Sequence, residues 1–368
     1  MDPPHSYTTN INRQDHRKLS SQLICQEIFH LVGVDPFVKV SKIISHVVAQ
    51  FNYTLSYRKA WIARIKAVEH VYGNWEKSYN QLPHYLLALQ KYVFSTIVIL
   101  EKLPTYTLDG TCVDGSKILS RLFWAFPSCI KGFAFYKPVI QVNGTWLYVK
   151  YKGTLLMAVA QDGNYNIFSI AFALVEGETC ESWSFFLRNL RTHVTLQPNL
   201  CLIFDIHASI VSAYNNPANG WHNPSSVHVY CIRHIAHNFM RVIKDRNLRK
   251  KVVNVGYALS QPSFMYYHEE VRLSNAEALS WVNRIPVEKW TRAFDGGCRW
   301  GHMTTNLVES LNDIFKGTRN LPITALVRAT YYRLGSLFAV RGKKMERCLG
   351  IRAIIRRNMY EIYEGGNC

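Results

Sequence analysis

Three oxygen-bearing side chains stand at the ends of predicted secondary-structure elements. Asn143 follows a β-branched run, Asp205 follows an apolar run, and Glu309 lies on a predicted helix. Carboxylate and amide oxygens are ligands that hard divalent cations such as Mg²⁺ accept. An amide keeps one oxygen ligand but lacks the negative charge, so Asn143 is the weak member of such a site.

A cysteine and a histidine three residues apart, Cys231 and His234, stand at a predicted strand–helix junction. They could ligate zinc, but a structural zinc site takes about four ligands. No second pair has suitable spacing, so the fold would have to bring in others. The candidates are Cys180, Cys201, His228 and His237. We therefore favour a local structural role for Cys231 and His234 over a zinc site.

The elements that would position these side chains follow a regular order. The runs 139–142, 154–160 and 167–175 predict three strands, with Asp162-Gly163 as a hairpin turn. Near-continuous apolar sequence predicts that these strands are buried on both faces.

The chain then continues with a helix over 181–190, a strand over 199–204, a strand over 227–231 and a further helix. This order resembles a ribonuclease H-like core, so the predicted fold class is α/β with a mixed sheet. The first and fourth strands are neighbours in such a sheet. We therefore expect Asn143 and Asp205 to lie side by side.

Six segments are expected along the chain. They are a disordered leader (1–18), a helical N-terminal module (19–100), the first part of the core (101–240), a basic helical insertion (241–295), a core helix carrying Glu309 (296–345) and a C-terminal tail (346–368).

The N-terminal module ends in two predicted helices. Ser56 is expected to cap the third helix of the module, which has Trp61, Ile65, Val68 and Val71 on one face. Its basic residues are Arg58, Lys59, Arg64 and Lys66. Three short helices with a basic third helix resemble a helix-turn-helix unit. A helical module whose basic side chains are simply solvated is the favoured alternative.

Residues 85–99 predict a fourth helix, so we expect no strand before Leu108-Asp109-Gly110-Thr111. That tetrapeptide resembles a catalytic signature, but without a preceding strand we interpret it as a turn. The aromatic run 119–126 is expected to pack on the flank of the sheet.

The composition favours a polyanionic partner. The chain has 368 residues, 48% of them hydrophobic, and a formal net charge of +18. Such a charge favours nucleic acid, and the densest basic run lies in the predicted insertion. It consists of Arg241, Lys244, Arg246, Arg249, Lys250 and Lys251.

No apolar run is long enough to span a bilayer, and residues 1–5 lack the features of a signal peptide. We therefore expect no membrane association and a location in the cytosol or nucleus. The nine cysteines form no CxxC pair, and most are expected to be buried thiols.

Several sequence blocks resemble the transposase domain of plant Mutator-like elements. They are Asn143-Gly144-Thr145, 151–156, 160–164, 170–178, Phe204-Asp205-Ile206-His207, Cys231-Ile232-Arg233-His234 and the segment 295–312. Residues 56–61, 72–76 and 79–83 are similar to the region that precedes that domain. The resemblance covers nearly all of residues 19–345.

The resemblance implies a DDE-type transposase that cuts and joins DNA with two divalent ions, Mg²⁺ or Mn²⁺. It places Asn143, Asp205 and Glu309 at the three acidic positions, with Asp205 and Glu309 as the remaining carboxylate ligands. Because Asn143 departs from the family pattern, we expect impaired activity. Asp162 and Asp109 could replace the charge, but neither is favoured.

The resemblance also marks residues around these positions. Cys231 and His234 belong to its pattern, and His207 could orient Asp205, touch DNA or be partly buried. For Arg299 and His302 we expect contacts with DNA phosphates.

The family's zinc modules before and after the catalytic domain have no counterpart in this sequence, which predicts a truncated, element-derived copy. We expect a nuclear DNA-binding protein, with homo-oligomerisation left open. The alternatives are an active two-metal transposase or nuclease and a domesticated nuclear transcriptional regulator.

Overall fold

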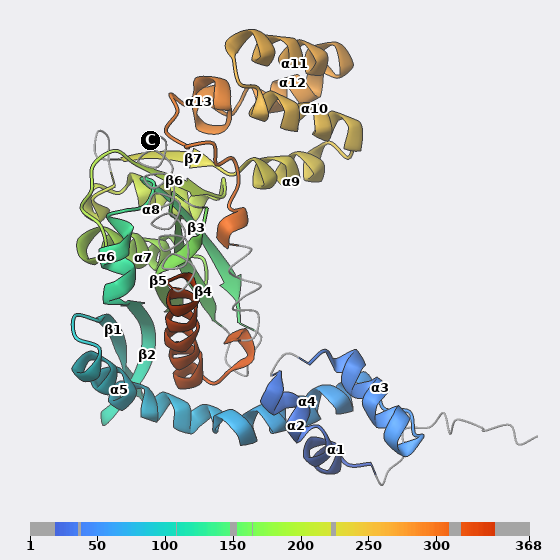
Figure 1. Cartoon of the computed structure of the whole chain (residues 1–368), viewed down its shortest axis with the longest axis vertical. Coiled ribbons are helices and arrows are strands. Elements are labelled where there is room, and N and C mark those ends of the chain that lie inside the picture. Colours follow the sequence, from blue (N-terminus) through green and yellow to red (C-terminus); the bar gives the residue numbers. More distant parts are fainter. Residues whose placement is uncertain are drawn as a thin grey trace, which may run out of the picture.

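Seven strands form one mixed sheet in the part of the chain that the computed structural model describes. That part comprises residues 19–35, 38–107, 109–147, 153–163, 165–221, 226–308 and 318–342. The strands are β1 (Ile97–Tyr106), β2 (Cys112–Ala125), β3 (Val139–Trp146), β4 (Thr154–Gln161), β5 (Ile167–Val175), β6 (Leu200–Phe204) and β7 (Ser226–Tyr230). Their order in the sheet is β1-β2-β5-β4-β3-β6-β7 (Figure 1).

The pairing of the central strands confirms the predicted neighbours. β3, β4 and β5 form an antiparallel meander, and β6 lies parallel to β3 on one side and to β7 on the other. All eight residues of β4 are buried. The middle strand of the sheet is therefore buried on both faces, as its apolar run predicted.

Helices cover both faces of this sheet. On one face, Ile140 and Val142 of β3 belong to the core that contains Phe186 and Leu190 of α7 (Cys180–His193). This core also includes α8 (Ala208–Asn215). Thr179 caps α7 by accepting a hydrogen bond from Ser182 N at 3.1 Å. The cap fixes the loop that leads from β5 into α7.

The other face packs against helices from both ends of the chain. Met157 and Val159 of β4 share a core with the N-terminal helices and with Leu326 and Val327. Residues 323–342 are helical, and Trp124 donates a hydrogen bond to Thr330 there at 3.1 Å. Leu156 and Ala158 of β4 belong to the first core, so the two faces of this strand lie in two different cores.

The hairpin of β1 and β2 corrects two predictions. A strand does precede the turn at Asp109, and residues 119–125 lie within β2 rather than on the flank of the sheet. β2 pairs with β5 from Leu122–Leu174 to Trp124–Phe172. The run Ile97–Ile99, which we assigned to the end of a helix, consists of β-branched residues and favours a strand.

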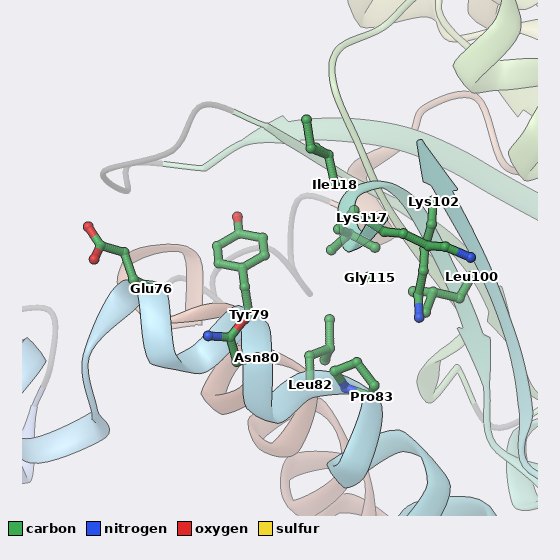
Figure 2. A pocket seen from close by; sticks show the side chains of 11 residues that line it. Glu76, Tyr79, Asn80, Leu82, Pro83, Leu100, Lys102, Gly115, Lys117 and Ile118 are labelled. Atoms are coloured by element: carbon green, nitrogen blue, oxygen red, sulfur yellow. The ribbon is translucent and has the colours of Figure 1, made fainter. Parts of the chain in front are cut away.

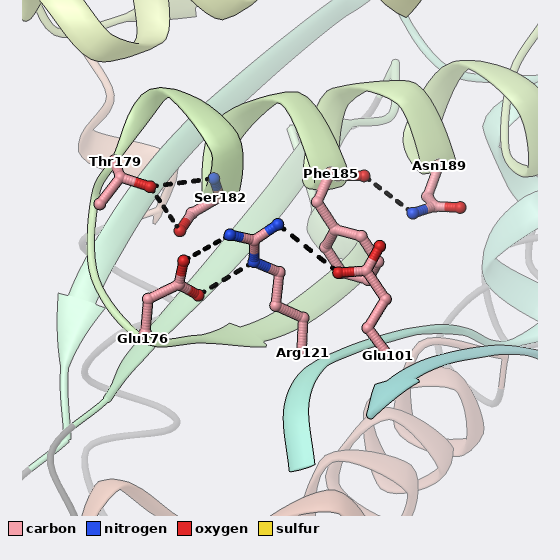
Figure 3. A network of polar contacts seen from close by, with 7 residues as sticks. All are labelled: Glu101, Arg121, Glu176, Thr179, Ser182, Phe185 and Asn189. Carbon is pink, nitrogen blue, oxygen red and sulfur yellow. Dashed lines mark hydrogen bonds and ion pairs between the residues drawn. The ribbon is translucent and has the colours of Figure 1, made fainter. Parts of the chain in front are cut away.

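An ion-pair network joins this hairpin to the end of β5. Arg121 donates to both carboxylate oxygens of Glu176, the first at 3.0 Å, and lies 3.5 Å from Glu101 of β1 (Figure 3). Burial raises the pKa of Glu176, but the hydrogen bonds that the carboxylate accepts and the charge of Arg121 together outweigh it, so the pKa lies below its ordinary value. The network links β1, β2 and the β5–α7 loop.

The N-terminal helices confirm one predicted cap and correct one face. They are α1 (Ser21–Glu27), α2 (Phe29–Val34), α3 (Val40–Phe51), α4 (Tyr57–Tyr72) and α5 (Trp75–Tyr92). Ser56 accepts the Lys59 N–H at 3.4 Å. The buried face of α4 carries Ala60, Ala63, Ala67 and Val68, whereas Trp61 is 41% exposed. Small alanine side chains let the neighbouring helices approach α4 closely, and Trp61 lies outside this buried face.

Between β7 and residue 303 the chain is largely helical. The helices are α9 (Ile232–Val242), α10 (Arg246–Tyr257), α11 (Gln261–Ser274), α12 (Ala276–Val282) and α13 (Val287–Trp290). α10, α11 and α12 project from one end of the sheet, and a short helix, α6 (Pro127–Phe133), joins β2 to β3 (Figure 1). Within the described ranges, no helix has the length and hydropathy to cross a membrane.

His228 of β7 is expected to make the stability of the folded protein depend on pH. It stacks on Phe204 with ring centroids 5.3 Å apart, and Lys289 donates to its backbone carbonyl at 3.2 Å. Burial and the nearby Lys289 charge lower its pKa from 6.5 to about 4. The unfolded chain therefore takes up this proton at higher pH than the folded chain.

The free energy of unfolding should consequently fall as the pH drops from 6.5 towards 4. For His228 alone we expect a loss of about 2 kcal/mol between pH 7 and pH 5. Urea unfolding at both pH values, compared with His228→Gln, measures it. An equal pH dependence in both proteins would show that His228 does not titrate as inferred.

Candidate active site at the edge of β3 and β6

Asn143 and Asp205 lie at the same level of two adjacent parallel strands. Gln141 of β3 and Ile203 of β6 form the last residue pair between these two strands. Two residues further along each strand, the same register brings Asn143 level with Asp205. Residues two apart on a strand share a face. The predicted adjacency of the two strands is confirmed, and both side chains are half-buried.

Asp205 carries an oxygen without a donor. Its Oδ1 is buried and has no hydrogen-bond partner among the described residues. Asn143 Oδ1, in contrast, accepts the N–H of Gly144 at 2.9 Å. A buried carboxylate oxygen is costly unless something compensates its charge. Asp205 is therefore the described residue of this edge best suited to hold a cation.

Glu178 is a carboxylate of this region that the sequence analysis did not select. It lies between β5 and α7, and a Cβ placed on Gly144 would meet its Oε1 at 2.7 Å. Its side chain thus packs on the backbone next to Asn143, and a larger residue at Gly144 would displace this carboxylate. Burial raises its pKa; the charge of His207 lowers it, and that of Asp205 adds to the increase.

No sequence signal separated Glu178 from its neighbours. Glu176 lies in the same loop and pairs with Arg121, and Glu181 lies at the start of α7. Glu178 alone of these three has a pKa raised by Asp205. The path of the β5–α7 loop determines which glutamate points towards Asn143 and Asp205. The spacing of residue types along the sequence does not reveal this path.

Glu309 lies outside the described residues, but the described residues on either side of 309–317 contact β3. Gln141 Oε1 accepts the N–H of Leu307 at 3.2 Å, and Thr145 Oγ1 accepts from Arg319 at 2.7 Å. Gln141 and Thr145 flank Asn143 by two residues each way on the same face of the strand. The C-terminal segment is therefore attached to β3 on both sides of Asn143.

Cys231 supports the start of that segment. Its Sγ accepts the N–H of Thr305 at 3.3 Å, and the next residue, Ile232, donates to Met303 O at 2.9 Å. Burial raises the pKa of Cys231, but the hydrogen bonds from His234 and Thr305 and the charge of His234 together outweigh this, so the pKa lies below its ordinary value. These contacts fit the structural role expected for Cys231 and His234.

The described residues provide no zinc site. Across these ranges, no group of three or more histidine, cysteine, aspartate or glutamate side chains is placed to hold a metal ion. Cys180, Cys201, His228 and His237 thus do not join Cys231 and His234 as a ligand set.

Arg299 does not face solvent, which corrects the expected phosphate contact. The side chain is 0% exposed, and its guanidinium donates to Tyr230 O at 3.0 Å and Lys289 O at 2.6 Å. Asp295 lies 3.5 Å away and is 5% exposed. Arg299 therefore joins the end of β7 to α13 instead of contacting DNA.

His207 and His302 have different surroundings. His207 is exposed and shares a 2.6 Å hydrogen bond with Ser209 Oγ, which in turn donates to Glu178 O. His302 is half-buried, and burial lowers its pKa, as does the charge of Lys137. Of the two, only His207 is open to a ligand at the β3–β6 edge.

The aspartates considered as substitutes for the missing charge lie elsewhere. Asp162 accepts the backbone N–H of Asn166 at 2.8 Å in the β4–β5 turn. This turn lies near the start of β3, away from Asn143. Asp109 occupies the tip of the β1–β2 hairpin. Neither is placed beside Asp205.

The predicted basic residues form two separate groups. On α4, Arg58 and Lys66 are exposed, and Lys59 and Arg64 are half-buried. Around the start of α10, a cavity of about 280 Å³ is lined by His237, Met240, Arg246, Arg249 and Lys250. Arg241 and Lys244 are also exposed, and Lys251 donates to Ser274 Oγ at 2.7 Å.

A further cavity of about 730 Å³ lies between α5 and the β1–β2 hairpin. Tyr79, Asn80, Lys102 and Lys117 are among its lining residues (Figure 2). In the sheet, β5 and β4 separate this hairpin from β3. The cavity is therefore distinct from the edge that carries Asn143 and Asp205.

The part of the chain that holds these residues matches a known family. Residues 139–238 match the family model of the MULE transposase domain. The matched range begins at β3, ends in α9 and contains Asn143, Glu178 and Asp205. The match supports a Mutator-like, transposase-related protein. No curated protein matches the chain.

Proposed function

We propose that this chain is a DNA-binding protein derived from a DDE-type transposase, with a site impaired by Asn143. The observation that carries the proposal is the position of Asn143 level with Asp205, whose buried Oδ1 lacks a donor among the described residues. The strand order β5-β4-β3-β6-β7, an antiparallel meander followed by two parallel strands, supports a ribonuclease H-like core.

The donor atoms at this edge suit a hard cation. Asp205 would hold Mg²⁺ or Mn²⁺ through carboxylate oxygen, and the family resemblance adds Glu309 as a second ligand. Bound ions of this kind activate the attacking oxygen and stabilise the leaving oxygen of a phosphodiester. Asn143 can supply only a neutral oxygen, and that oxygen already accepts a hydrogen bond from Gly144. The first acidic position therefore lacks its charge.

Glu178 supports a second candidate function, an active two-metal transposase or nuclease. Its carboxylate packs on Gly144 and interacts with the charge of Asp205, so it could replace the charge that Asn143 lacks. Nicking of supercoiled plasmid in Mg²⁺ separates the two candidates. For the impaired site, the natural chain should nick no faster than Asp205→Asn. Nicking that both Asp205→Asn and Glu178→Gln abolish would establish the active enzyme.

DNA binding in this proposal is mainly electrostatic and takes place in the nucleus. The exposed residues around the start of α10 are the strongest candidates for phosphate contacts. The double variant Arg249→Ala/Lys250→Ala should weaken binding to all duplex sequences alike. It should also reduce the slope of log K against log salt by about two, since each lost phosphate contact removes about one.

Fluorescence anisotropy at several salt concentrations measures this slope. Arg272→Ala is the matched control, because Arg272 is an exposed arginine of the same region that pairs with Glu269. A complex that is insensitive to salt or selective for one sequence would contradict the proposal.

A further inference from the structure

Cys201 and Cys298 come together from distant parts of the sequence. Cys201 lies on β6, is 0% exposed and belongs to a small apolar cluster with Val139 and Ile203. Cys298 packs against the same cluster from the loop after α13. Both are free thiols, so two cysteines from distant segments meet in one cluster without a disulfide bond between them.

The two thiols have different surroundings. Cys298 is partly exposed, and the negative charge of Asp295 and the positive charges of Arg299 and Lys289 lie near it. The nearby Cys201 thiol lowers the pKa of Cys298 and outweighs the effect of burial. Cys201 is enclosed, and its pKa lies well above the ordinary value because of the nearby Cys298 thiol and its burial. Reactivity towards oxidants follows thiolate character and exposure.

We propose that Cys298 and Cys201 form a peroxide-sensitive thiol pair, in which Cys298 is oxidised first and Cys201 closes a disulfide. The Cys298 thiolate attacks one oxygen of hydrogen peroxide, and the O–O bond breaks to give a sulfenic acid and hydroxide. Cys201 then attacks the sulfenic sulfur, the S–O bond breaks, and hydroxide leaves with the Cys201 proton as water. Two thiols are oxidised and one peroxide is reduced to two waters.

The disulfide would tie β6 to the loop from Asp295 to Gly301. This loop carries the buried Arg299 and leads to Thr305, which contacts Cys231. Oxidation would therefore restrain the segment that precedes Leu307, which contacts β3 beside Asn143. The proposal does not depend on the proposed function, because the two thiols are not among the residues proposed to hold a metal ion.

The test is mass spectrometry of the full chain after treatment with hydrogen peroxide and alkylation of the remaining thiols. Trypsin releases Cys298 on residues 293–299, whereas Cys201 and Cys231 share residues 192–233. A second digestion with chymotrypsin, which cleaves after Phe204 and Tyr214, separates these two cysteines. We expect a Cys201–Cys298 link that dithiothreitol removes.

Two variants and one internal control sharpen the result. Cys298→Ser should abolish the link, and Cys201→Ala should leave a Cys298 sulfenic acid that dimedone traps. Exposed Cys112 is the control for unselective oxidation. Cys298 oxidation no faster than that of Cys112, or a link from Cys298 to Cys231, would overturn the proposal. Because the first comparison uses the natural chain, it stands even if Cys201→Ala fails to fold.

Discussion

Replacing Asn143 by aspartate is expected to raise the affinity for Mg²⁺ by about ten- to a hundredfold, which corresponds to roughly 1.4–2.8 kcal/mol. The new carboxylate would stand level with Asp205 and restore the charge of the first acidic position. Calorimetric titration of Mg²⁺ or Mn²⁺ measures this without requiring DNA recognition. Asn80→Asp adds the same charge at an exposed position of α5 and should leave the affinity unchanged.

The titration also separates the two candidate functions. Equal affinity in the natural and Asn143→Asp chains would show that the site has lost more than one ligand. Tight binding of two ions by the natural chain would favour Glu178 as the compensating carboxylate. In that case Glu178→Gln should lower the affinity of the natural chain, whereas in the impaired site it should have little effect.

Replacing Arg299 by methionine is expected to lower the free energy of unfolding by about 3–5 kcal/mol. The substitution leaves the buried Asp295 carboxylate without its cation and two backbone carbonyls without a donor. Urea unfolding measures the loss. The double variant Arg299→Met/Asp295→Asn should recover part of it, because the unpaired charge is then removed as well.

Arg292→Ala is the matched control for this substitution, since Arg292 is an exposed arginine of the same segment. Surface substitutions of this kind usually change stability by less than about 0.5 kcal/mol. If Arg299→Met were as mild as this control, the guanidinium would not hold β7 and α13 together as the hydrogen bonds indicate.

The sequence predicted the centre of the sheet well because its strands are buried on both faces. Continuous apolar runs such as 154–160 have few alternatives to a central strand, and the order of elements then placed β3 beside β6. The β1–β2 hairpin was missed because Ile97–Leu100 follows a helical pattern without a break. This segment becomes a strand because it pairs with β2, which in turn pairs with β5. Local periodicity does not encode such pairing.

The candidate site was predicted in part for a similar reason. Predicted strand ends identified Asn143 and Asp205, although β3 continues through Asn143 to Trp146. A loop path determines that Glu178 lies near them. Arg299 shows the opposite case. An arginine beside a glycine-rich turn suggests solvent exposure, whereas tertiary structure surrounds it with backbone carbonyls and one buried carboxylate. Such desolvated cations cannot be recognised from residue type alone.

The contacts on either side of Asn143 have a kinetic consequence. The hydrogen bond from Leu307 to Gln141 joins residues 166 positions apart, and that from Arg319 to Thr145 spans 174 positions. Contacts between such distant residues form slowly, because a long loop must close first. The β3–β5 meander needs only local turns. During refolding we therefore expect the meander to gain protection from hydrogen exchange before the C-terminal segment docks, so a folding intermediate would have a formed β3–β5 meander and an unassembled candidate site.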